Sequence, residues 1–193
     1  MSKFLVIAEK PSVAQSYAKN LSAYKREDGY LEGESCIVSW CLGHLAEYAQ
    51  PEEYDPKYEK WQFDDLPILP EAWKLKVSKD KKKQFDVLKG LMNRSDVEYL
   101  VNGCDAGREG ELIFQRVYVL AGCRKPVKRL WISSMEDAAI QKGFQTMKSE
   151  EEYKNLCMAA VCRAQADWLI GMNGTRAYTT RSVSYTHLTL PTT

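Results

Sequence analysis

Short apolar stretches alternate along this chain with segments of helical spacing, and this alternation limits the possible folds more than any other feature. Each apolar stretch is short enough for a strand buried on both faces. Strands and helices in this order favour an α/β fold, a parallel sheet flanked by helices. The expected strands span Lys3–Ala8, Val97–Asn102 and Val127–Ile132, and the expected helices span residues 11–21, Asp80–Met92, Gly107–Ala121 and Met135–Met147.

Other parts of the chain depart from this pattern. Residues 35–48 are rich in β-forming residues and are interrupted by Gly43, which predicts a strand, a turn and a short second strand. Residues 51–70 hold four prolines and several aromatic residues, so we expect a long irregular excursion, followed by a brief strand over residues 73–77. A helical pattern over residues 151–172 predicts a further helix.

Composition restricts the class of protein. The 193 residues are 45% hydrophobic and 27% charged, as in an ordinary globular protein, and neither a signal peptide nor an apolar run of membrane-spanning length is recognisable. This predicts a cytoplasmic location. Six cysteines without a CxxC pair predict reduced thiols and no zinc site. The net charge of +1 gives no global signal for nucleic acid, so any DNA contact must be local.

The last eleven residues differ from everything before them. The stretch VSYTHLTLPTT, residues 183–193, is rich in threonine and contains no Asp, Glu, Lys or Arg. It resembles the translated end of an adapter used in preparing sequencing libraries, and the alternative is a natural disordered terminus. We therefore expect a non-native tail and exclude it from the fold.

Acidic residues follow two of the expected strands. Glu9 comes directly after the first strand, and Asp105 and Glu109 follow the strand that ends near residue 102. Ligands of parallel sheets bind outside the carboxyl ends of the strands, where both stretches would lie. Carboxylates crowded together repel one another unless a cation joins them, and a cluster of oxygen ligands suits Mg²⁺ with a substrate phosphate. The sequence therefore predicts a magnesium site for a phosphodiester substrate. The alternative is that Asp105 and Glu109 are an ordinary solvated pair of acids on the surface of a helix.

These residues resemble the TOPRIM domain that type IA topoisomerases, bacterial primases and some nucleases share. Glu9, within LVIAEKPSVA, matches the isolated glutamate of that family, and Asp105 and Glu109 match the first and last acids of its DxDxE element. Gly107 stands where the middle acid belongs, which puts a second metal site in doubt. Glu111 is expected to be close enough to contribute.

Two further stretches resemble the type IA pattern specifically, and within it the topoisomerase III branch. They are LVIAEKPS near the N-terminus and ADWLIGMN with Thr175 and Arg176 after it, so that the resemblance covers residues 1–181. It implies an Mg²⁺-dependent, ATP-independent enzyme that cuts and reseals one DNA strand and relaxes negative supercoils. It also implies single-stranded DNA segments as substrate, no membrane and a monomer.

The resemblance further implies roles for single residues. Glu9, Lys10 and Arg108 would act at the scissile phosphate. Glu9, Asp105, Glu109 and Glu111 would hold the metal, and Lys10, Arg163, Asp167 and Arg176 would contact DNA. The family's catalytic tyrosine lies in a later domain, so neither Tyr178 nor Tyr185 is expected to replace it and this fragment is expected to be inactive alone.

The expected domains are a TOPRIM domain over residues 1–150, the beginning of a helical DNA-binding domain over residues 151–182, and the tail. Two other functions stay open. One is a TOPRIM primase or nuclease that uses the same acids, and the other is a non-catalytic protein that only binds nucleic acid.

Overall fold

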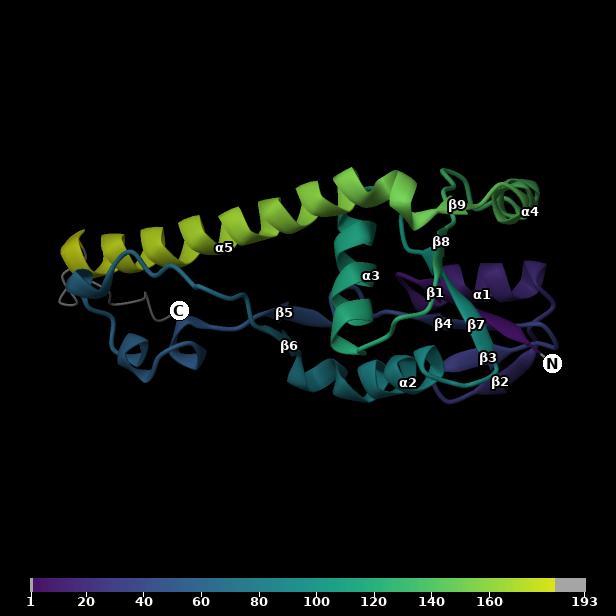
Figure 1. The fold of residues 1–193 in the computed structure, drawn as a ribbon, viewed down its shortest axis with the longest axis horizontal. Coiled ribbons are helices and arrows are strands. Elements are labelled where there is room, and N and C mark those ends of the chain that lie inside the picture. Colours follow the sequence, from purple (N-terminus) through teal and green to yellow (C-terminus); the bar gives the residue numbers. More distant parts are fainter. Residues whose placement is uncertain (1, 183–193) are drawn as a thin grey trace, which may run out of the picture. The chain divides into compact units, whose positions relative to one another are not determined.

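A computed structural model describes residues 2–182 of the chain, and the predicted tail lies outside these described residues. Two compact units divide the described part. The first comprises residues 2–47 and 75–161, and the second comprises residues 48–74 and 162–182. The helices and strands of both units are labelled in Figure 1.

A seven-stranded sheet forms the centre of the first unit, with the strand order β2-β3-β4-β1-β7-β8-β9. Its middle consists of four parallel strands, β4 (Cys36–Trp40), β1 (Lys3–Ala8), β7 (Val97–Gly103) and β8 (Val127–Arg129). At one edge β2 (Lys25–Glu27) and β3 (Tyr30–Glu32) are antiparallel, and at the other edge β9 (Lys148–Ser149) runs antiparallel to β8. The predicted parallel sheet is confirmed, and it carries antiparallel edges.

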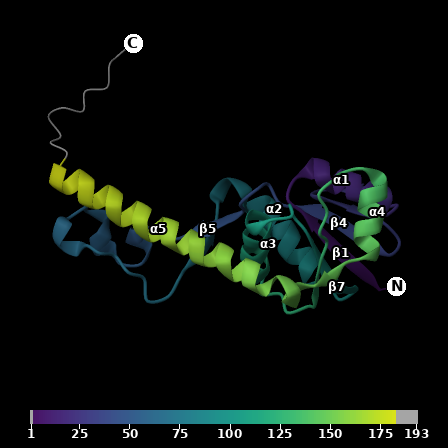
Figure 2. The ribbon, with the colours of Figure 1, turned by 90° about the horizontal axis from the view of Figure 1, so that it is seen from above.

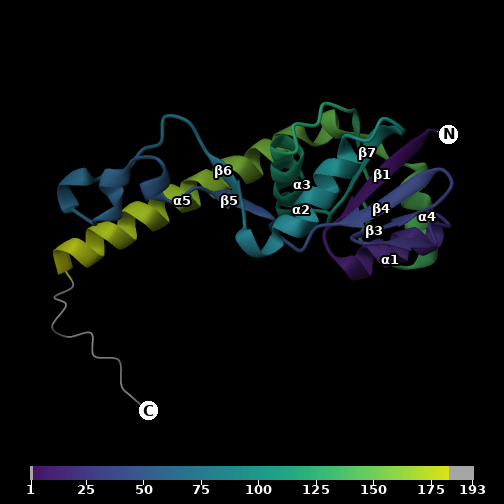
Figure 3. The same ribbon diagram turned by 90° about the horizontal axis from the view of Figure 1, so that it is seen from below.

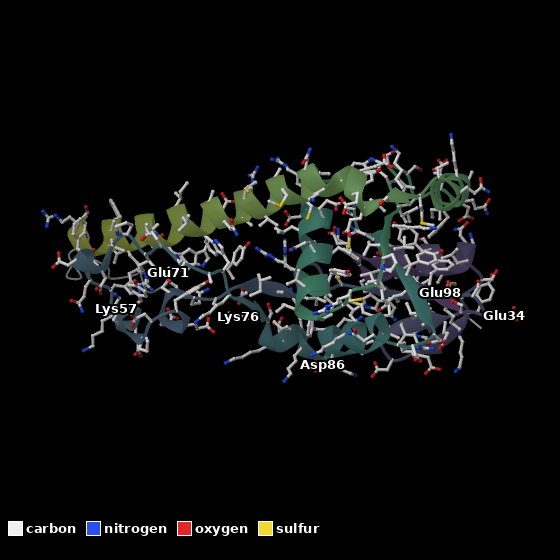
Figure 4. The ribbon with its side chains drawn as sticks, viewed as in Figure 1. Glu34, Lys57, Glu71, Lys76, Asp86 and Glu98 are labelled. Carbon is white, nitrogen blue, oxygen red and sulfur yellow. The ribbon has the colours of Figure 1, made fainter. Side chains whose placement is uncertain are left out.

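Helices cover both faces of this sheet, as the views in Figures 2 and 3 show. Apolar residues of α2 (Lys82–Met92) and α3 (Arg108–Leu120) pack on one face in a cluster with Leu5 and Ile7. Residues of α1 (Pro11–Asn20) and α4 (Asp137–Gln145) pack on the other face with Val6 and Ala8. The alternation of side chains along β1 therefore supplies both cores. Charged side chains such as Asp86 and Glu98 point outward (Figure 4).

The second unit is built around the excursion that the prolines predicted. Three short 3₁₀ helices, Pro51–Glu53, Pro56–Glu59 and Phe63–Asp65, replace regular strands. The later part of α5 (Lys154–Ser182) contacts the chain after these helices: the Asn173 side chain bonds both the N–H and the C=O of Ile68, at 2.6 and 3.0 Å. The Trp168 ring packs edge-on against Trp73 and donates to the carbonyl of Ala49 at 3.1 Å. Side chains of one helix thus satisfy the backbone of an irregular segment.

Three features differ from the sequence prediction. The hairpin of β2 and β3 was not predicted, although Asp28-Gly29 is a turn signal and Gly29 has a φ of +85°. The last helix continues to Ser182 instead of ending near Met172. The strand pair β5 (Ala46–Tyr48) and β6 (Leu75–Val77) forms a separate small sheet. The expected boundary at residue 150 stays a prediction, and the structure groups residues 48–74 with the end of α5.

Candidate metal centre

Glu9 and Asp105 lie at the carboxyl ends of β1 and β7, where the parallel strands of the sheet finish. We call this row of strand ends the sheet edge. The two strands are parallel neighbours, with Ala8 opposite Gly103, so Glu9 and Asp105 follow neighbouring strand ends. The ammonium of Lys10 lies between them, with Nζ 3.3 Å from Glu9 Oε1 and 3.8 Å from Asp105 Oδ2. Acids that are almost a hundred residues apart in the chain therefore share one cationic neighbour.

Glu109 reaches the same edge from the first turn of α3. Its Oε1 is hydrogen-bonded to Nε2 of His44, which follows β4 by way of Gly43. The N–H of Gly43 in turn donates to the carbonyl of Glu9 at 3.3 Å, which ties this loop to the end of β1. His44 was not among the predicted site residues. The available signal was its place after a buried strand that ends at the same edge.

The carboxylate of Glu9 is the most confined of these acids. Glu9 is only 8% exposed, and its Oε2 is buried without a hydrogen-bond partner. A buried charged oxygen is costly unless a cation or a donor reaches it. Glu9 and Asp105 also raise the pKa of Lys10. An orphaned buried carboxylate oxygen at this strand end fits a hard cation with oxygen ligands.

The acids are not drawn together into a closed cage. Within residues 2–182, no group of three or more His, Cys, Asp or Glu side chains is close enough to hold a metal ion. The structure therefore gives a common edge and a suitable set of oxygen ligands, with Lys10 against Glu9 and Asp105 and with His44 against Glu109.

Glu111 has a different environment from the one that the sequence suggested. It is 1% exposed, and its two oxygens face Arg129 Nε at 2.5 Å and Asn102 Nδ2 at 3.4 Å. Residues two apart on a helix point in different directions, so Glu111 turns inward while Glu109 stays exposed. The expectation that Glu111 adds to the metal ligands therefore lacks support from its position.

Arg129, like His44, was not among the predicted site residues. Its fully buried guanidinium donates to the carbonyls of Asn102, Cys104 and Leu130 at 3.0, 2.7 and 2.8 Å, and to the carbonyl of Asp105 at 2.7 Å. These bonds fix the backbone turn that carries Asp105. The signal in the sequence was a charged residue two positions after Val127 in a predicted strand, and therefore on the same face as that apolar side chain. A charged residue is rarely buried unless it is paired.

Known proteins resemble this chain in sequence and fold. A match to the Toprim domain family covers residues 4–135, which is more than half of the chain. The chain belongs to the Toprim family. DNA topoisomerase 3 of Bacillus subtilis is 51% identical over 181 residues, and that of Bacillus cereus strain ATCC 14579 is 52% identical over the same length. Each alignment covers 94% of this chain and 25% of the relative, so the chain spans about a quarter of their length.

The Toprim fold also appears in a solved structure of full-length topoisomerase I from Thermotoga maritima. The TM-score is 0.57 with 18% identity, over 86% of this chain and 24% of that one. At this identity the likeness supports the fold alone.

Gly107 departs from the Toprim acid pattern, and the structure shows that an acid would fit there. A Cβ at Gly107 would meet no heavy atom within 4 Å, and its φ of 170° is ordinary extended backbone. Gly107 is also the N-cap of α3, a position that favours aspartate. We predict that Gly107→Asp folds normally and binds Mn²⁺ about three- to tenfold more tightly, because it adds a carboxylate beside Asp105. Isothermal titration calorimetry checks this, and Gly107→Asn is the uncharged control. An equal gain in both variants would contradict the prediction.

The remaining predicted site residues are placed as follows. Arg108 is exposed in the first turn of α3. In the second unit, exposed Arg163 and Asp167 form the expected pair, with 3.7 Å between Nε and Oδ2. Arg176, expected to contact DNA, is 5% exposed: it donates to the Tyr58 carbonyl at 2.6 Å, pairs with Glu52 at 3.6 Å and lies over the Trp61 ring. Its contacts hold the excursion to α5 within that unit.

No helix within residues 2–182 has the combination of length and apolar character that crossing a bilayer requires.

Proposed function

We propose that this chain is the metal-binding module of a type IA DNA topoisomerase of the topoisomerase 3 kind. The whole enzyme would cut and rejoin one DNA strand with Mg²⁺ and without ATP, and would relax negatively supercoiled DNA. Single-stranded segments would be its substrate, and it would act as a monomer in the bacterial cytosol or nucleoid. The observation that carries the proposal is the convergence of Glu9 and Asp105 on one ammonium at the sheet edge, in a chain half identical to DNA topoisomerase 3.

Each residue at the edge has a proposed task. Glu9, Asp105 and Glu109 would hold Mg²⁺, which when bound supplies positive charge against a phosphate. Lys10 and Arg108 would bind the phosphate oxygens through charge-assisted hydrogen bonds. Glu9, confined at the strand end, would hold or move a proton near the scissile phosphate. Arg129 would keep the Asp105 backbone in place. The tyrosine that the family uses for cleavage would come from another part of a longer protein.

A domain exchange tests the enzymatic part of the proposal. Residues 1–181 would replace the aligned quarter of Bacillus subtilis DNA topoisomerase 3, and the chimera would be assayed for relaxation of a negatively supercoiled plasmid. We expect relaxation with Mg²⁺ and without ATP, and its loss in the Asp105→Asn chimera. A module from a primase or nuclease would not support strand passage. A folded but inactive chimera would therefore contradict the proposal.

The metal site has its own test. We predict that Asp105→Asn weakens Mn²⁺ binding by at least about tenfold, because a neutral amide replaces an anionic ligand. Calorimetric titration of the 193-residue chain without DNA measures this. Asp86→Asn, which removes an exposed acid on α2, is the matched control and should leave the affinity unchanged. Equal affinities of Asp105→Asn and wild type would refute the assignment.

A further inference from the structure

Lys10 contacts the two acids in a way that bears on how a cation binds. Its Nζ lies 3.3 Å from Glu9 Oε1 and 3.8 Å from Asp105 Oδ2. Both distances exceed the 2.7–2.9 Å of a strong charge-assisted hydrogen bond. The Lys10 side chain is 56% exposed, and exposed ion pairs of this kind are weak. The ammonium thus balances the charge of both carboxylates without being firmly fixed to either.

The burial of the Glu9 carboxylate is the reason that a positive charge is needed at the sheet edge. The carboxylate is almost completely buried, and one of its oxygens has no partner. Without Lys10, no cation would lie between the Glu9 and Asp105 carboxylates to offset their repulsion. An ammonium at this position lowers that repulsion.

We infer that Lys10 is a placeholder cation, which a divalent metal ion displaces from Glu9 and Asp105 when these acids take it up. The inference rests on the proposed function, since it assumes that the same acids hold the metal. When the metal ion displaces it, the Lys10 ammonium stays on the exposed side of Glu9 and Asp105, where it can donate to a phosphate oxygen. Metal uptake and phosphate binding by Lys10 are then coupled.

This inference predicts a different change in metal affinity from the one expected if Lys10 only binds phosphate. An ammonium and a divalent cation that compete for the same two carboxylates repel each other at short range. Removing the ammonium must therefore strengthen metal binding in the absence of DNA. A lysine that serves only the phosphate would leave metal affinity almost unchanged.

The test compares Mn²⁺ affinities of the 193-residue chain without DNA, measured by electron paramagnetic resonance of free Mn²⁺. We expect Lys10→Gln to bind Mn²⁺ about fivefold more tightly than wild type, and Lys10→Arg, which keeps the charge, to stay close to wild type. Lys19→Gln removes an exposed charge on α1 that pairs with Asp137, and it should change the affinity by less than about twofold. A gain in Lys10→Gln no larger than that in Lys19→Gln would overturn the inference, and so would weaker binding.

A second measurement follows Lys10 directly. Selective ¹⁵N labelling of lysines resolves the Lys10 side chain by NMR, and saturation with Mg²⁺ should shift its signals more than those of Lys19, which pairs with Asp137 elsewhere. Unchanged Lys10 signals at saturating Mg²⁺ would refute displacement. The Asp105→Asn variant separates the two proposals: if it binds Mn²⁺ like wild type, the metal site itself is wrong, whatever Lys10 does. Absence of binding in every variant would overturn both.

Discussion

Replacing Arg129 by methionine while Glu111 is kept should lower the free energy of unfolding by about 3–5 kcal/mol. The substitution leaves the Glu111 carboxylate buried without its cation, and it removes the donors of four backbone carbonyls, including those of Cys104 and Asp105. An uncompensated buried charge is among the most destabilising changes known for single residues. Urea unfolding followed by circular dichroism measures the loss.

Two further variants make this prediction specific. Lys128→Met removes the neighbouring exposed charge and should change the stability by no more than about 0.5 kcal/mol. Glu111→Leu combined with Arg129→Met removes both charges and should recover part of the loss, because paired buried charges are often replaceable by apolar residues. A double variant less stable than Arg129→Met would show that Glu111 is not the reason for the loss.

Gly110→Ala is expected to have the second large effect. A Cβ on Gly110 would overlap the carbonyl oxygen of Asp105 and lie 2.9 Å from its N and 3.0 Å from its C. These atoms belong to the backbone turn that Arg129 holds, so they cannot move away cheaply. Overpacking of a core costs about 1–3 kcal/mol, and a clash with fixed backbone belongs at the upper end of this range or beyond it.

Gly107→Ala is the matched control, because a Cβ there has open space although it lies only three residues away. We expect it to cost at most about 1 kcal/mol, as alanine is a poorer N-cap than glycine. Thermal unfolding and Mn²⁺ affinity should both separate the pair. Equal stability and equal Mn²⁺ affinity of the two alanine variants would show that Gly110 does not need to be a glycine for α3 to pack against the Asp105 backbone.

The fold was largely predictable because its central strands β1 and β7 are short apolar runs that can be recognised from the local sequence. The apolar runs ending at Ala8 and near Asn102 are β1 and β7, and their order with the helices indicated a parallel sheet. The hairpin of β2 and β3 escaped notice because its strands are only three residues long and none of their residues is buried. The end of the last helix was missed because α5 lacks a clear apolar stripe, so periodicity could not mark its end.

The candidate site was predictable only where strand ends determine position. Glu9 and Asp105 follow neighbouring strands, and their meeting at one edge follows from topology. Spacing alone could not tell that Glu111 turns inward to Arg129, since that pairing depends on a strand 18 residues further on. Likewise, Arg176 reads as an available basic residue in the sequence, whereas in its unit it is buried against Tyr58 and Trp61. The partner of a buried charge depends on how distant segments pack together, and the local sequence pattern does not contain that information.

The central claim is that acids from two strand ends hold one divalent cation at this edge of the sheet, and paramagnetic broadening of amide NMR signals tests it most directly. With a small fraction of one equivalent of Mn²⁺, the signals of Glu9, Asp105 and Glu109 should broaden first, while those of Lys25 to Glu32 on β2 and β3 stay sharp. Broadening that begins at acids of the second unit, such as Glu52 or Asp64, and spares Glu9 and Asp105 would contradict the account.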